Sequence, residues 1–399
     1  MNTLTNNIRQ VLLVILFTMA LFASYPYVFS QFIAMPNPIL LNGTILCATF
    51  LIAITARKKF ITFPSKINKI VIIQFVGYFL LGIIHNDKLD FVRCYFLIIV
   101  YLLLLCLYNT GTLLKYIKFN NYLLSLQCIL GVVAFILFFI GQLSPIFPFE
   151  NTDGRIAYCY GLTCSNAVVD NVIRVAGYFD EPGSLAFWGI YALILNKTFI
   201  DNKKVEAILI FCLLFTLSVA YYIQVLLYVL LYYGSNLKKN VFYIIFIVTL
   251  LVGFFIYVNN NSGSTLYQLT IGRFEVNKGS VTIESERSLL AERAKKVFES
   301  SPVIGVGQTN IRSGEYMGDN EYELLASDGI VGMFLIYFPL IVVARGRKSR
   351  KKFLFASTIL FAGYLQRPFH CSVIHFAMFY IYVITAILYF NNKLYIQNR

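Results

Sequence analysis

Apolar runs separated by short polar segments occupy most of the chain. A helix perpendicular to a bilayer needs roughly 20 apolar residues to cross it, and several of these runs are shorter. Two neighbouring runs, at 205–217 and 218–233, read as separate spans or as one broken or sharply turned hairpin. The runs cover approximately 11–30, 39–54, 70–84, 91–108, 122–143, 183–195, 205–217, 218–233, 241–258, 325–343, 353–366 and 372–390. The pattern predicts an all-α polytopic membrane protein with about 12 transmembrane helices.

The composition excludes a soluble fold. Hydrophobic residues make up 58% of the 399 residues, charged residues only 13%, and the mean hydropathy is +0.71. A soluble globule of this size cannot hide so much apolar surface. The net charge of +14 does not indicate nucleic-acid binding, because no basic and aromatic soluble module accompanies it. The first run has no small-residue cleavage site before a polar domain, so we expect a retained span and not a signal peptide.

Lys and Arg are divided unevenly between alternate loops. The segments that would face one side hold 21 of the 33, although the longest polar loop lies on the other side. Since positive charge is retained in the cytoplasm, both termini are expected to be cytoplasmic. We expect a single membrane domain, 1–399, with external loops at 144–182 and 259–324.

The long external loop contains a short helical pattern. Acidic residues begin it and lysines end it, as the helix dipole favours: Glu284, Glu286, Lys295 and Lys296. Apolar residues recur on one side at helical spacing: Leu290, Ala294, Val297 and Phe298. Pro302 then stops the helix. The pattern predicts an amphipathic helix whose apolar side docks on another apolar surface.

The two sides also differ in the kind of basic residue. The expected cytoplasmic side holds 15 Lys and 6 Arg, and the external side holds 4 Lys and 8 Arg. Guanidinium groups bind phosphate and pyrophosphate through two parallel hydrogen bonds, so the external face is predicted to bind anions. The alternative is that each external Arg pairs with a loop carboxylate or a lipid headgroup.

The most specific string of the chain runs from Arg174 to Gly183 and leads directly into an apolar run. It places Arg174 and Glu181 at the membrane surface. Ionisable groups at that depth are costly unless they are paired or used. The functional interpretation is a site for an anionic substrate, and the structural one is an Arg–carboxylate pair that fixes the start of the helix.

This string, with the pattern Arg-x-x-Gly-x-Phe-x-Glu-Pro, resembles the signature of bacterial O-antigen and capsular polysaccharide polymerases, which share a superfamily with the O-antigen ligases. The long loop is similar to theirs as well. Its matching features are Arg287 opening a helix, the segment 301–307, and the segment 319–332 with Asp319, Asn320 and Tyr322. Many relatives, the ligases included, have His before this Asn, so a histidine base does not carry over to Asp319.

The resemblance implies a metal-independent glycosyltransferase in the bacterial inner (plasma) membrane, active at its outer, periplasmic face. It would polymerise undecaprenyl-pyrophosphate-linked oligosaccharide repeat units into O-antigen or capsular polysaccharide with inversion at the transferred sugar. The expected catalytic residues are Arg174, Glu181 and Asp319, with Glu181 or Asp319 as the base. The residues expected to bind pyrophosphate or glycan are Arg273, Arg287, Arg293, Asn320, Tyr322, Arg367 and His370. The expected partners are the lipid bilayer and a chain-length regulator and flippase of the same pathway; no cofactor is expected.

Two other functions are consistent with the same pattern. An O-antigen ligase would transfer finished glycan to a lipid A core. A lipid-linked oligosaccharide flippase or another transporter would carry charged or broken sites near the bilayer midplane. The apolar runs are almost free of charge and the ionisable residues gather at one side, which favours chemistry at the surface over transport.

The remaining motifs carry less information. Gly305 and Gly307 follow a helix and not a strand, so they predict a tight turn and not a phosphate loop. His370 lies near Arg367 and could contact sugar or phosphate or be structural. The three histidines are dispersed and have no carboxylate pair at ligand spacing, which argues against a metal site. Cys159 and Cys164 share an external loop, and their spacing leaves a disulfide open.

Overall fold

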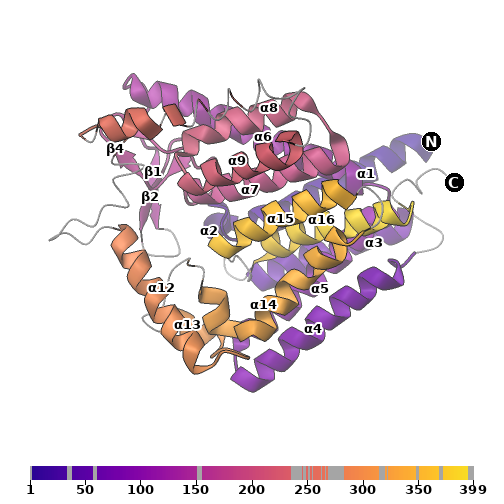
Figure 1. Ribbon diagram of the computed structural model, residues 1–399. Coiled ribbons are helices and arrows are strands. Elements are labelled where there is room, and N and C mark those ends of the chain that lie inside the picture. Colours follow the sequence, from indigo (N-terminus) through magenta and orange to yellow (C-terminus); the bar gives the residue numbers. More distant parts are fainter. Residues whose placement is uncertain are drawn as a thin grey trace. The chain divides into compact units, whose positions relative to one another are not determined.

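The structure is a computed structural model of a mostly helical chain (Figure 1). It describes residues 2–33, 38–56, 61–150, 155–234, 245, 249, 252–253, 255–261, 263–265, 267, 283–313, 320, 322–346, 350–367 and 372–393. Within this part, seven helical segments are long and apolar enough to cross a membrane. They are Thr5–Phe22, Ser65–His85, Lys88–Asn109, Leu113–Phe139, Pro182–Ile200, Glu323–Ala344 and Val373–Phe390. The fold is therefore that of a helical membrane protein.

Most of the predicted apolar runs coincide with helices where the structure describes them, but the run at 11–30 is helical only as far as Phe22 before the short helix at Ser30–Ile33, and the run at 122–143 is helical only as far as Phe139. The run at 241–258 lies largely outside the described residues. The helices are α1 (Asn2–Phe22), α2 (Ser30–Ile33), α3 (Pro38–Ala56), α4 (Ser65–His85), α5 (Lys88–Asn109), α6 (Leu113–Phe139), α7 (Pro182–Leu195), α8 (Lys203–Cys212), α9 (Val219–Tyr233), α12 (Ile283–Ser300), α13 (Gln308–Ser313), α14 (Glu323–Ala344), α15 (Arg350–Gln366) and α16 (Val373–Phe390). The expected number of about 12 spans stays a prediction, as does the cytoplasmic placement of the termini.

The chain divides into two compact units. The first unit comprises Met1–Phe119, Ala291–Ser357 and Arg367–Arg399, and the second comprises Asn120–Leu290 and Thr358–Gln366. Each unit is built from segments that are far apart in the sequence. The chemistry of each is therefore described separately.

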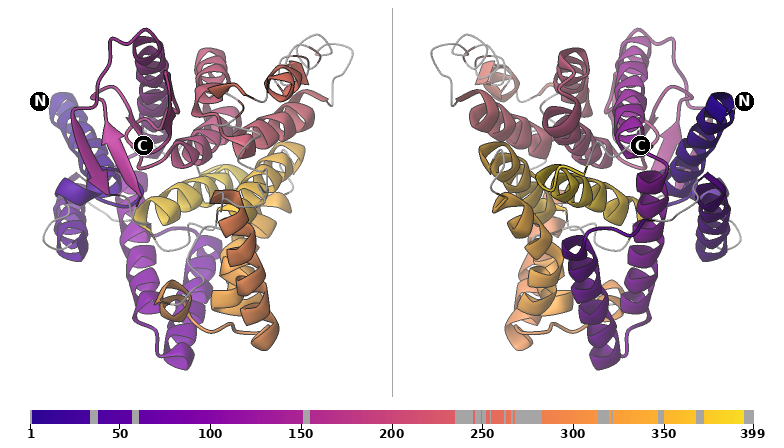
Figure 2. Two further views of the ribbon diagram at one scale, coloured as in Figure 1. Left: turned by 90° about the vertical axis from the view of Figure 1, so that its left-hand side faces the viewer. Right: turned by 90° about the vertical axis from the view of Figure 1, so that its right-hand side faces the viewer.

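In the first unit, α4 and α5 form a hairpin whose turn passes through Asn86 in the left-handed conformation, with a φ of 49°. Figure 2 shows this hairpin in purple. α14 packs on α4, and α16 packs on α5. α16 is apolar on every side and is buried along nearly its whole length. Gln74 links three helices, because its Nε2 donates to the Leu335 carbonyl at 2.5 Å and its Oε1 accepts from Tyr380.

In the second unit, the fully buried helix α7 contacts α8 and α9. The chain between α8 and α9 is a single 3-10 turn, Leu213–Thr216, followed by Leu217 at a φ of 48°. The 205–233 region is therefore interrupted, in agreement with the alternative of a broken hairpin, and whether its two helices are separate spans stays a prediction. Aromatic side chains fill the space between α7 and the end of α15: the rings of Phe187 and Tyr364 lie 5.4 Å apart.

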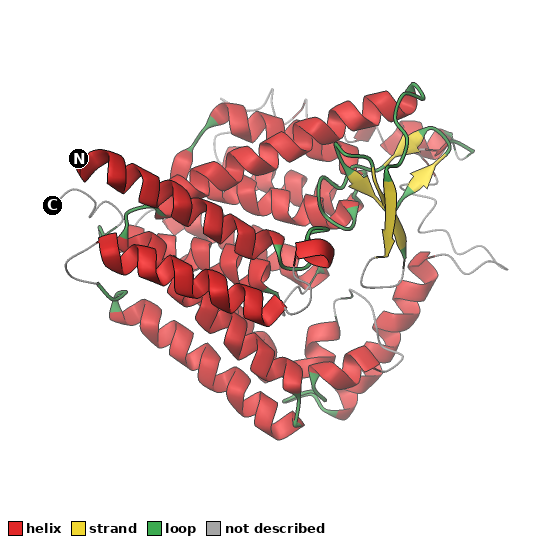
Figure 3. Cartoon of the chain, turned by 180° about the vertical axis from the view of Figure 1, so that it is seen from behind, coloured by secondary structure: helices red, strands yellow, loops and turns green. Residues whose placement is uncertain are grey.

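The loop at 144–182 contains short strands, so the expectation of an all-α chain is wrong in this loop. The strands are β1 (Phe147–Glu150), β2 (Ile156–Cys159), β3 (Cys164–Ser165), β4 (Val168–Val169) and β5 (Val172–Ile173). They form two antiparallel sheets, β1-β2-β3 and β4-β5, drawn in yellow in Figure 3. Aromatic and β-branched residues favour strands, and exposure alternates with burial along β2. Strands of two to four residues are too short for this alternation to stand out in the sequence.

The predicted amphipathic helix is α12, and its apolar side docks as expected. Ala294 is fully buried in a cluster with Ile311 and Ala326, against which Val297 and Phe298 also pack. One detail of the prediction is wrong. Lys295 and Lys296 precede the last turn of α12, because the helix continues to Ser300.

Candidate functional site

The segment from Arg174 to Pro182 in the second unit is held on both sides by backbone hydrogen bonds. On one side, the Ala176 amide donates to the Cys164 carbonyl at 3.1 Å, and the Cys164 amide donates to the Gly177 carbonyl at 2.6 Å. On the other, the Val175 amide donates to the Phe215 carbonyl at 3.1 Å. The segment thus lies between the β-hairpin and the break that separates α8 from α9, with backbone hydrogen bonds to both. Its position is fixed by main-chain groups and not by one side-chain pair.

The side chain of Arg174 is anchored at the same break. It is 6% exposed, and its Nε donates to the Thr216 carbonyl at 3.0 Å. A continuous helix would use the Phe215 and Thr216 carbonyls for its own ladder, but the 3-10 turn and Leu217 interrupt that ladder. Both carbonyls therefore accept bonds from the Arg174 segment. The interruption in the apolar run and the arginine motif form a single structural arrangement.

Glu181 occupies the cap position of α7, with Pro182 as the first helical residue. Proline suits this position because its missing N–H would have no helical partner. A carboxylate oxygen of Glu181 lies 3.4 Å from a terminal nitrogen of Arg155, while Glu181 itself is 7% exposed. Next to it, Asp180 accepts a hydrogen bond from Ser184 at 3.1 Å. The start of α7 thus carries two acidic residues whose positions are set by neighbouring side chains.

The arginine that pairs with Glu181 in this structure, Arg155, was not among the predicted site residues. It is separated from Glu181 by four short strands and by 26 residues of sequence. Its side chain is 35% exposed, in contrast to the buried Arg174. The only sequence signal for Arg155 was its membership of the external group of arginines. Pairing across a small sheet cannot be read from spacing.

Several predicted residues belong to the long loop and its flanks. Asn320 is 4% exposed, and its Oδ1 accepts from the Tyr322 amide at 3.0 Å. Tyr322 packs half-buried on the cluster of Ala294, Ile311 and Ala326. Arg287 and Arg293 lie on α12, where Arg293 is exposed, and Arg367 is 7% exposed just after α15. Arg273, Asp319 and His370 lie outside the described residues.

The segment with Gly305 and Gly307 packs against the start of α14 through backbone hydrogen bonds. Gly305 and Gly307 have φ angles of 71° and 92°, which confirms the predicted tight turn. The Gly307 amide donates to the Ser327 carbonyl at 2.8 Å, and the Val331 amide donates to the Val303 carbonyl at 3.0 Å. A Cβ atom on Gly305 would lie 2.3 Å from the backbone of Ser327. The segment before α13 therefore lies directly against the start of α14.

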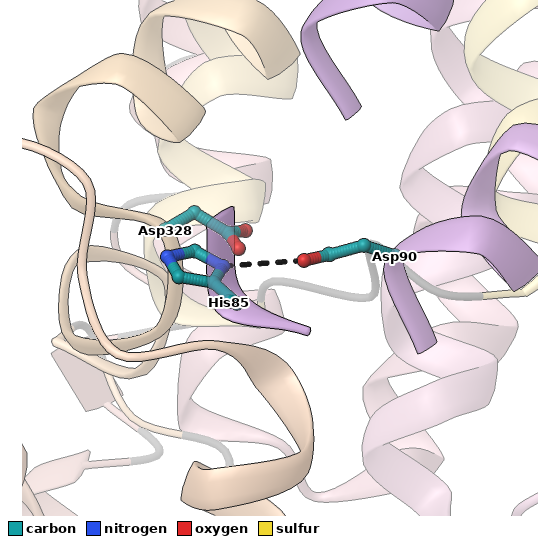
Figure 4. A group of neighbouring side chains, drawn as sticks. All are labelled: His85, Asp90 and Asp328. Atoms are coloured by element: carbon teal, nitrogen blue, oxygen red, sulfur yellow. Dashed lines mark hydrogen bonds and ion pairs between the residues drawn. The ribbon is translucent and has the colours of Figure 1, made fainter. Parts of the chain in front are cut away.

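A buried charged cluster lies next to this contact between the glycine segment and α14, in the first unit. The two terminal nitrogens of Arg93 donate to the two carboxylate oxygens of Asp328 at 2.6 and 2.8 Å, and Arg93 also pairs with Asp90. His85 Nδ1 lies 3.3 Å from the second oxygen of Asp90 (Figure 4). The side chains of Arg93, Asp90 and Asp328 are fully buried. The cluster joins the end of α4 and the start of α5 to the start of α14.

The carboxylates of this cluster bind the Arg93 guanidinium, and they fit it better than they would fit a metal ion. Ligand atoms of His85, Asp90 and Asp328 lie within 4.8 Å of one another, a spacing at which they could surround a cation. Arg93, however, already bonds both carboxylates. A cation placed between them would face this fixed positive charge at close range. We therefore interpret the cluster as a buried ion-pair network.

Asp87, in the turn between α4 and α5, docks α13. Its carboxylate accepts from the Thr309 amide at 2.6 Å, from the Thr309 hydroxyl, and from the Leu89 amide at 2.8 Å. Burial raises the pKa of Asp87, but these hydrogen bonds and the nearby charge of Arg93 outweigh it, so the pKa lies below its usual value. The segment 302–313 is thus attached to the α4–α5 hairpin by a charged group.

None of the residues of this cluster is among the predicted site residues. The sequence indicates Arg93 only as one of the arginines expected to be external, in apolar runs that are almost free of charge. The available signal was the spacing of Asp90 and Arg93, three positions apart at the start of the apolar run 91–108, which puts them on one helix face. Asp328, 235 residues from Arg93, becomes their partner only through tertiary packing. The cluster lies near the ends of α4, α5 and α14, and the gathering of charge on one side of the membrane stays a prediction.

Comparison with known proteins adds no relative: no family model, no curated protein and no solved structure matches this chain. The fold and the site define a helical membrane protein. Its segment ahead of α7 presents a buried arginine and a carboxylate paired with a second arginine.

Proposed function

We propose that the protein is a membrane glycosyltransferase that polymerises lipid-pyrophosphate-linked oligosaccharide repeat units, as its motifs resemble those of O-antigen and capsular polysaccharide polymerases. The observation that carries the proposal is the Arg174–Pro182 segment. It combines a buried, anchored guanidinium with the Arg155–Glu181 pair at the start of a membrane-spanning helix. The pyrophosphate of a lipid-linked substrate lies at the membrane surface, where the hydrocarbon core ends and where the start of such a helix would also lie.

The reaction requires the functional groups that this segment contains. The bond between the sugar anomeric carbon and the pyrophosphate oxygen breaks, and a bond forms from that carbon to a hydroxyl of the acceptor sugar. Charge accumulates on the departing pyrophosphate, and fixed guanidinium groups stabilise such charge. In our proposal, Arg174 and Arg155 meet the pyrophosphate. The acceptor proton passes to a carboxylate, for which Glu181 and Asp319 are the two candidates.

The membrane and the orientation are part of the proposal. The excess of Lys and Arg in alternate loops supports an arrangement with both termini in the cytoplasm and with segment 144–182 outside. In a bacterial cell this would place the Arg174 segment at the outer face of the plasma membrane. The substrate would then be an undecaprenyl-pyrophosphate oligosaccharide already carried to that face.

Incubation of the purified protein with one synthetic undecaprenyl-pyrophosphate oligosaccharide tests the proposal. We expect a ladder of glycans that differ by one repeat unit, with no nucleotide sugar added. A Glu181→Gln variant separates the two candidate bases, because it should retain activity if Asp319 is the base. Unchanged substrate in the presence of folded wild-type protein, assayed with repeat units of several sugar compositions, would refute polymerisation.

A second candidate function is transport of the lipid-linked oligosaccharide. The observation that favours it is the buried network of Arg93, Asp90 and Asp328, because ionisable groups inside membrane helices often mark transport pathways. The paired state of these groups and their position at helix ends favour a structural role instead. Protein reconstituted in vesicles with a fluorescent lipid-linked oligosaccharide in one leaflet separates the two functions, since a transporter moves the lipid without lengthening its glycan.

A further inference from the structure

Cys159 and Cys164 face each other across the β2–β3 hairpin of the second unit. They are direct partners in the register of the two strands. The adjacent pair, Tyr160 and Thr163, is bridged by a backbone hydrogen bond of 2.8 Å. The carbonyl of Cys159 accepts from Ile146, and the amide of Cys164 donates to Gly177, so both cysteines direct their backbone groups away from each other. They therefore form a non-hydrogen-bonded antiparallel pair.

This type of pair brings side chains closest together. Its Cα atoms are about 4.5 Å apart, which falls within the roughly 4.4–6.8 Å range that disulfides span. The side chains lie on one face of the sheet, and both residues are buried. A bond between the two sulfurs would therefore close across the hairpin without changing its register.

The two thiols already interact. A hydrogen bond from the Cys164 thiol lowers the pKa of Cys159 to about 6, even though partial burial opposes this. The same contact, together with burial, raises the pKa of Cys164 well above its usual value. Cys159 is also the more accessible of the two, at 8% exposed against 0% for Cys164. Cys159 thus has the properties of an attacking thiolate, and Cys164 those of a resolving thiol.

We propose that Cys159 and Cys164 form a redox couple that closes to a disulfide across the hairpin when it meets a small-molecule or protein disulfide. The Cys159 thiolate attacks one sulfur of the oxidant and releases the other as a thiolate. The Cys164 thiol then gives its proton to the released thiolate and attacks the Cys159 sulfur, which releases the second thiolate. Two protein thiols are oxidised and one oxidant disulfide is reduced to two thiols.

The bridge would act next to the segment that holds the candidate site. Cys164 exchanges backbone hydrogen bonds with Ala176 and Gly177, and the Thr163 hydroxyl accepts from the Gly177 amide at 2.9 Å. The disulfide would therefore brace the β2–β3 hairpin against which the Arg174–Pro182 segment lies. This inference depends on the hairpin alone and holds whether or not the protein is a polymerase.

Peptide mapping of the purified full-length protein tests the proposal. The protein is incubated with oxidised glutathione, its remaining thiols are alkylated under denaturing conditions, and the digest is analysed without reduction. We expect the peptide or peptides with residues 159 and 164 to be lighter by two hydrogens than the sum of the unmodified sequences, and to gain two alkyl groups only after reduction. Recovery of both cysteines as alkylated thiols in the glutathione-treated sample would overturn the proposal.

Two variants make the test specific. In Cys164→Ala, Cys159 should remain joined to one glutathione as a mixed disulfide, because the resolving thiol is absent. In Cys128→Ala, a matched removal of a buried cysteine on α6, the 159–164 bridge should form as in the wild type. If Cys164→Ala yields no mixed disulfide while the wild type forms its bridge, the assigned order of attack is wrong.

Discussion

Arg174 donates its Nε–H to the carbonyl of Thr216 at 3.0 Å, and this bond joins the segment ahead of α7 to the break between α8 and α9. The guanidinium is held through its inner nitrogen, Nε, and is 6% exposed. A positioned guanidinium at the start of a membrane helix is the main element of the proposed pyrophosphate site. Its geometry leads to the first prediction.

Replacement of Arg174 by Lys should lower the polymerisation rate at least about tenfold, nearly as much as replacement by Ala. An ammonium keeps the charge but has neither the planar two-pronged edge nor the Nε donor. Rates are measured as product ladders over time, and correct folding is checked by gel filtration and thermal midpoint. Arg345→Lys, at an exposed position at the end of α14, is the matched control and should be fully active. A folded Arg174→Lys protein with wild-type ladders would exclude the proposed role.

Asp328→Asn should destabilise the protein by about 3–5 kcal/mol, because it leaves the buried Arg93 with a weakened partner inside the helical core. The exposed pair Glu292–Lys296 has a similar distance of 3.0 Å, with both side chains more than half exposed. Its disruption in Glu292→Gln should cost less than about 1 kcal/mol. Denaturant titration in mixed micelles compares the two variants. Equal stability losses would show that burial of the Arg93 network is unimportant.

Gly305→Ala should be poorly folded, whereas Gly141→Ala should be tolerated. Both glycines have a φ of +71°, but a Cβ on Gly305 would lie 2.3 Å from the Ser327 backbone, and one on Gly141 would meet nothing within 4 Å. The shared φ costs roughly 1 kcal/mol in each variant, so the difference reports the steric clash alone. Yields of folded protein after detergent extraction measure it. Similar yields for both variants would contradict the close packing of segment 302–307 against the start of α14.

The thiol of Cys159 should be alkylated rapidly already at neutral pH. Its pKa is lowered to about 6 by the hydrogen bond from Cys164, so the reactive thiolate predominates above that pH, whereas an ordinary cysteine requires a pH of about 8.5. The rate is followed from pH 5 to 9 by mass spectrometry, with a phosphine reductant present to keep both thiols free. In Cys164→Ala the midpoint should move upward, because the donor is lost. If the alkylation rate of the wild type had its pH midpoint near 8.5, the hydrogen bond from Cys164 to Cys159 would be disproved.

The apolar pattern of the sequence was sufficient to predict most helices, because a membrane span needs a run whose length and composition are visible locally. The amphipathic side of α12 was predictable for the same reason: Ala294 and Phe298 recur with the helical period. The position of Glu181 at the start of α7 also followed from its place directly before an apolar run.

Relationships between distant residues were not predictable. Arg93 has a distant partner in Asp328, 235 residues away, besides its neighbour Asp90, and Glu181 pairs with Arg155, 26 residues away. Each pair forms only after helices or strands pack, and nothing in the local sequence specifies which charges then meet. The strands of segment 147–173 were missed because elements of two to four residues are too short to show a period. The break at Leu213–Leu217 was predicted, but its role as acceptor for Arg174 was not.

The stoichiometry of lipid release tests the central claim most directly. Purified protein is incubated with synthetic undecaprenyl-pyrophosphate oligosaccharide in the presence of a chelator and without nucleotide sugar, and both free undecaprenyl pyrophosphate and new glycosidic bonds are counted by mass spectrometry. The proposed transfer predicts one released lipid pyrophosphate for each repeat unit joined, with the rate unchanged by the chelator because arginines balance the charge. Lipid release without glycan growth, glycan growth without lipid release, or activity that returns only on addition of a divalent metal would contradict it.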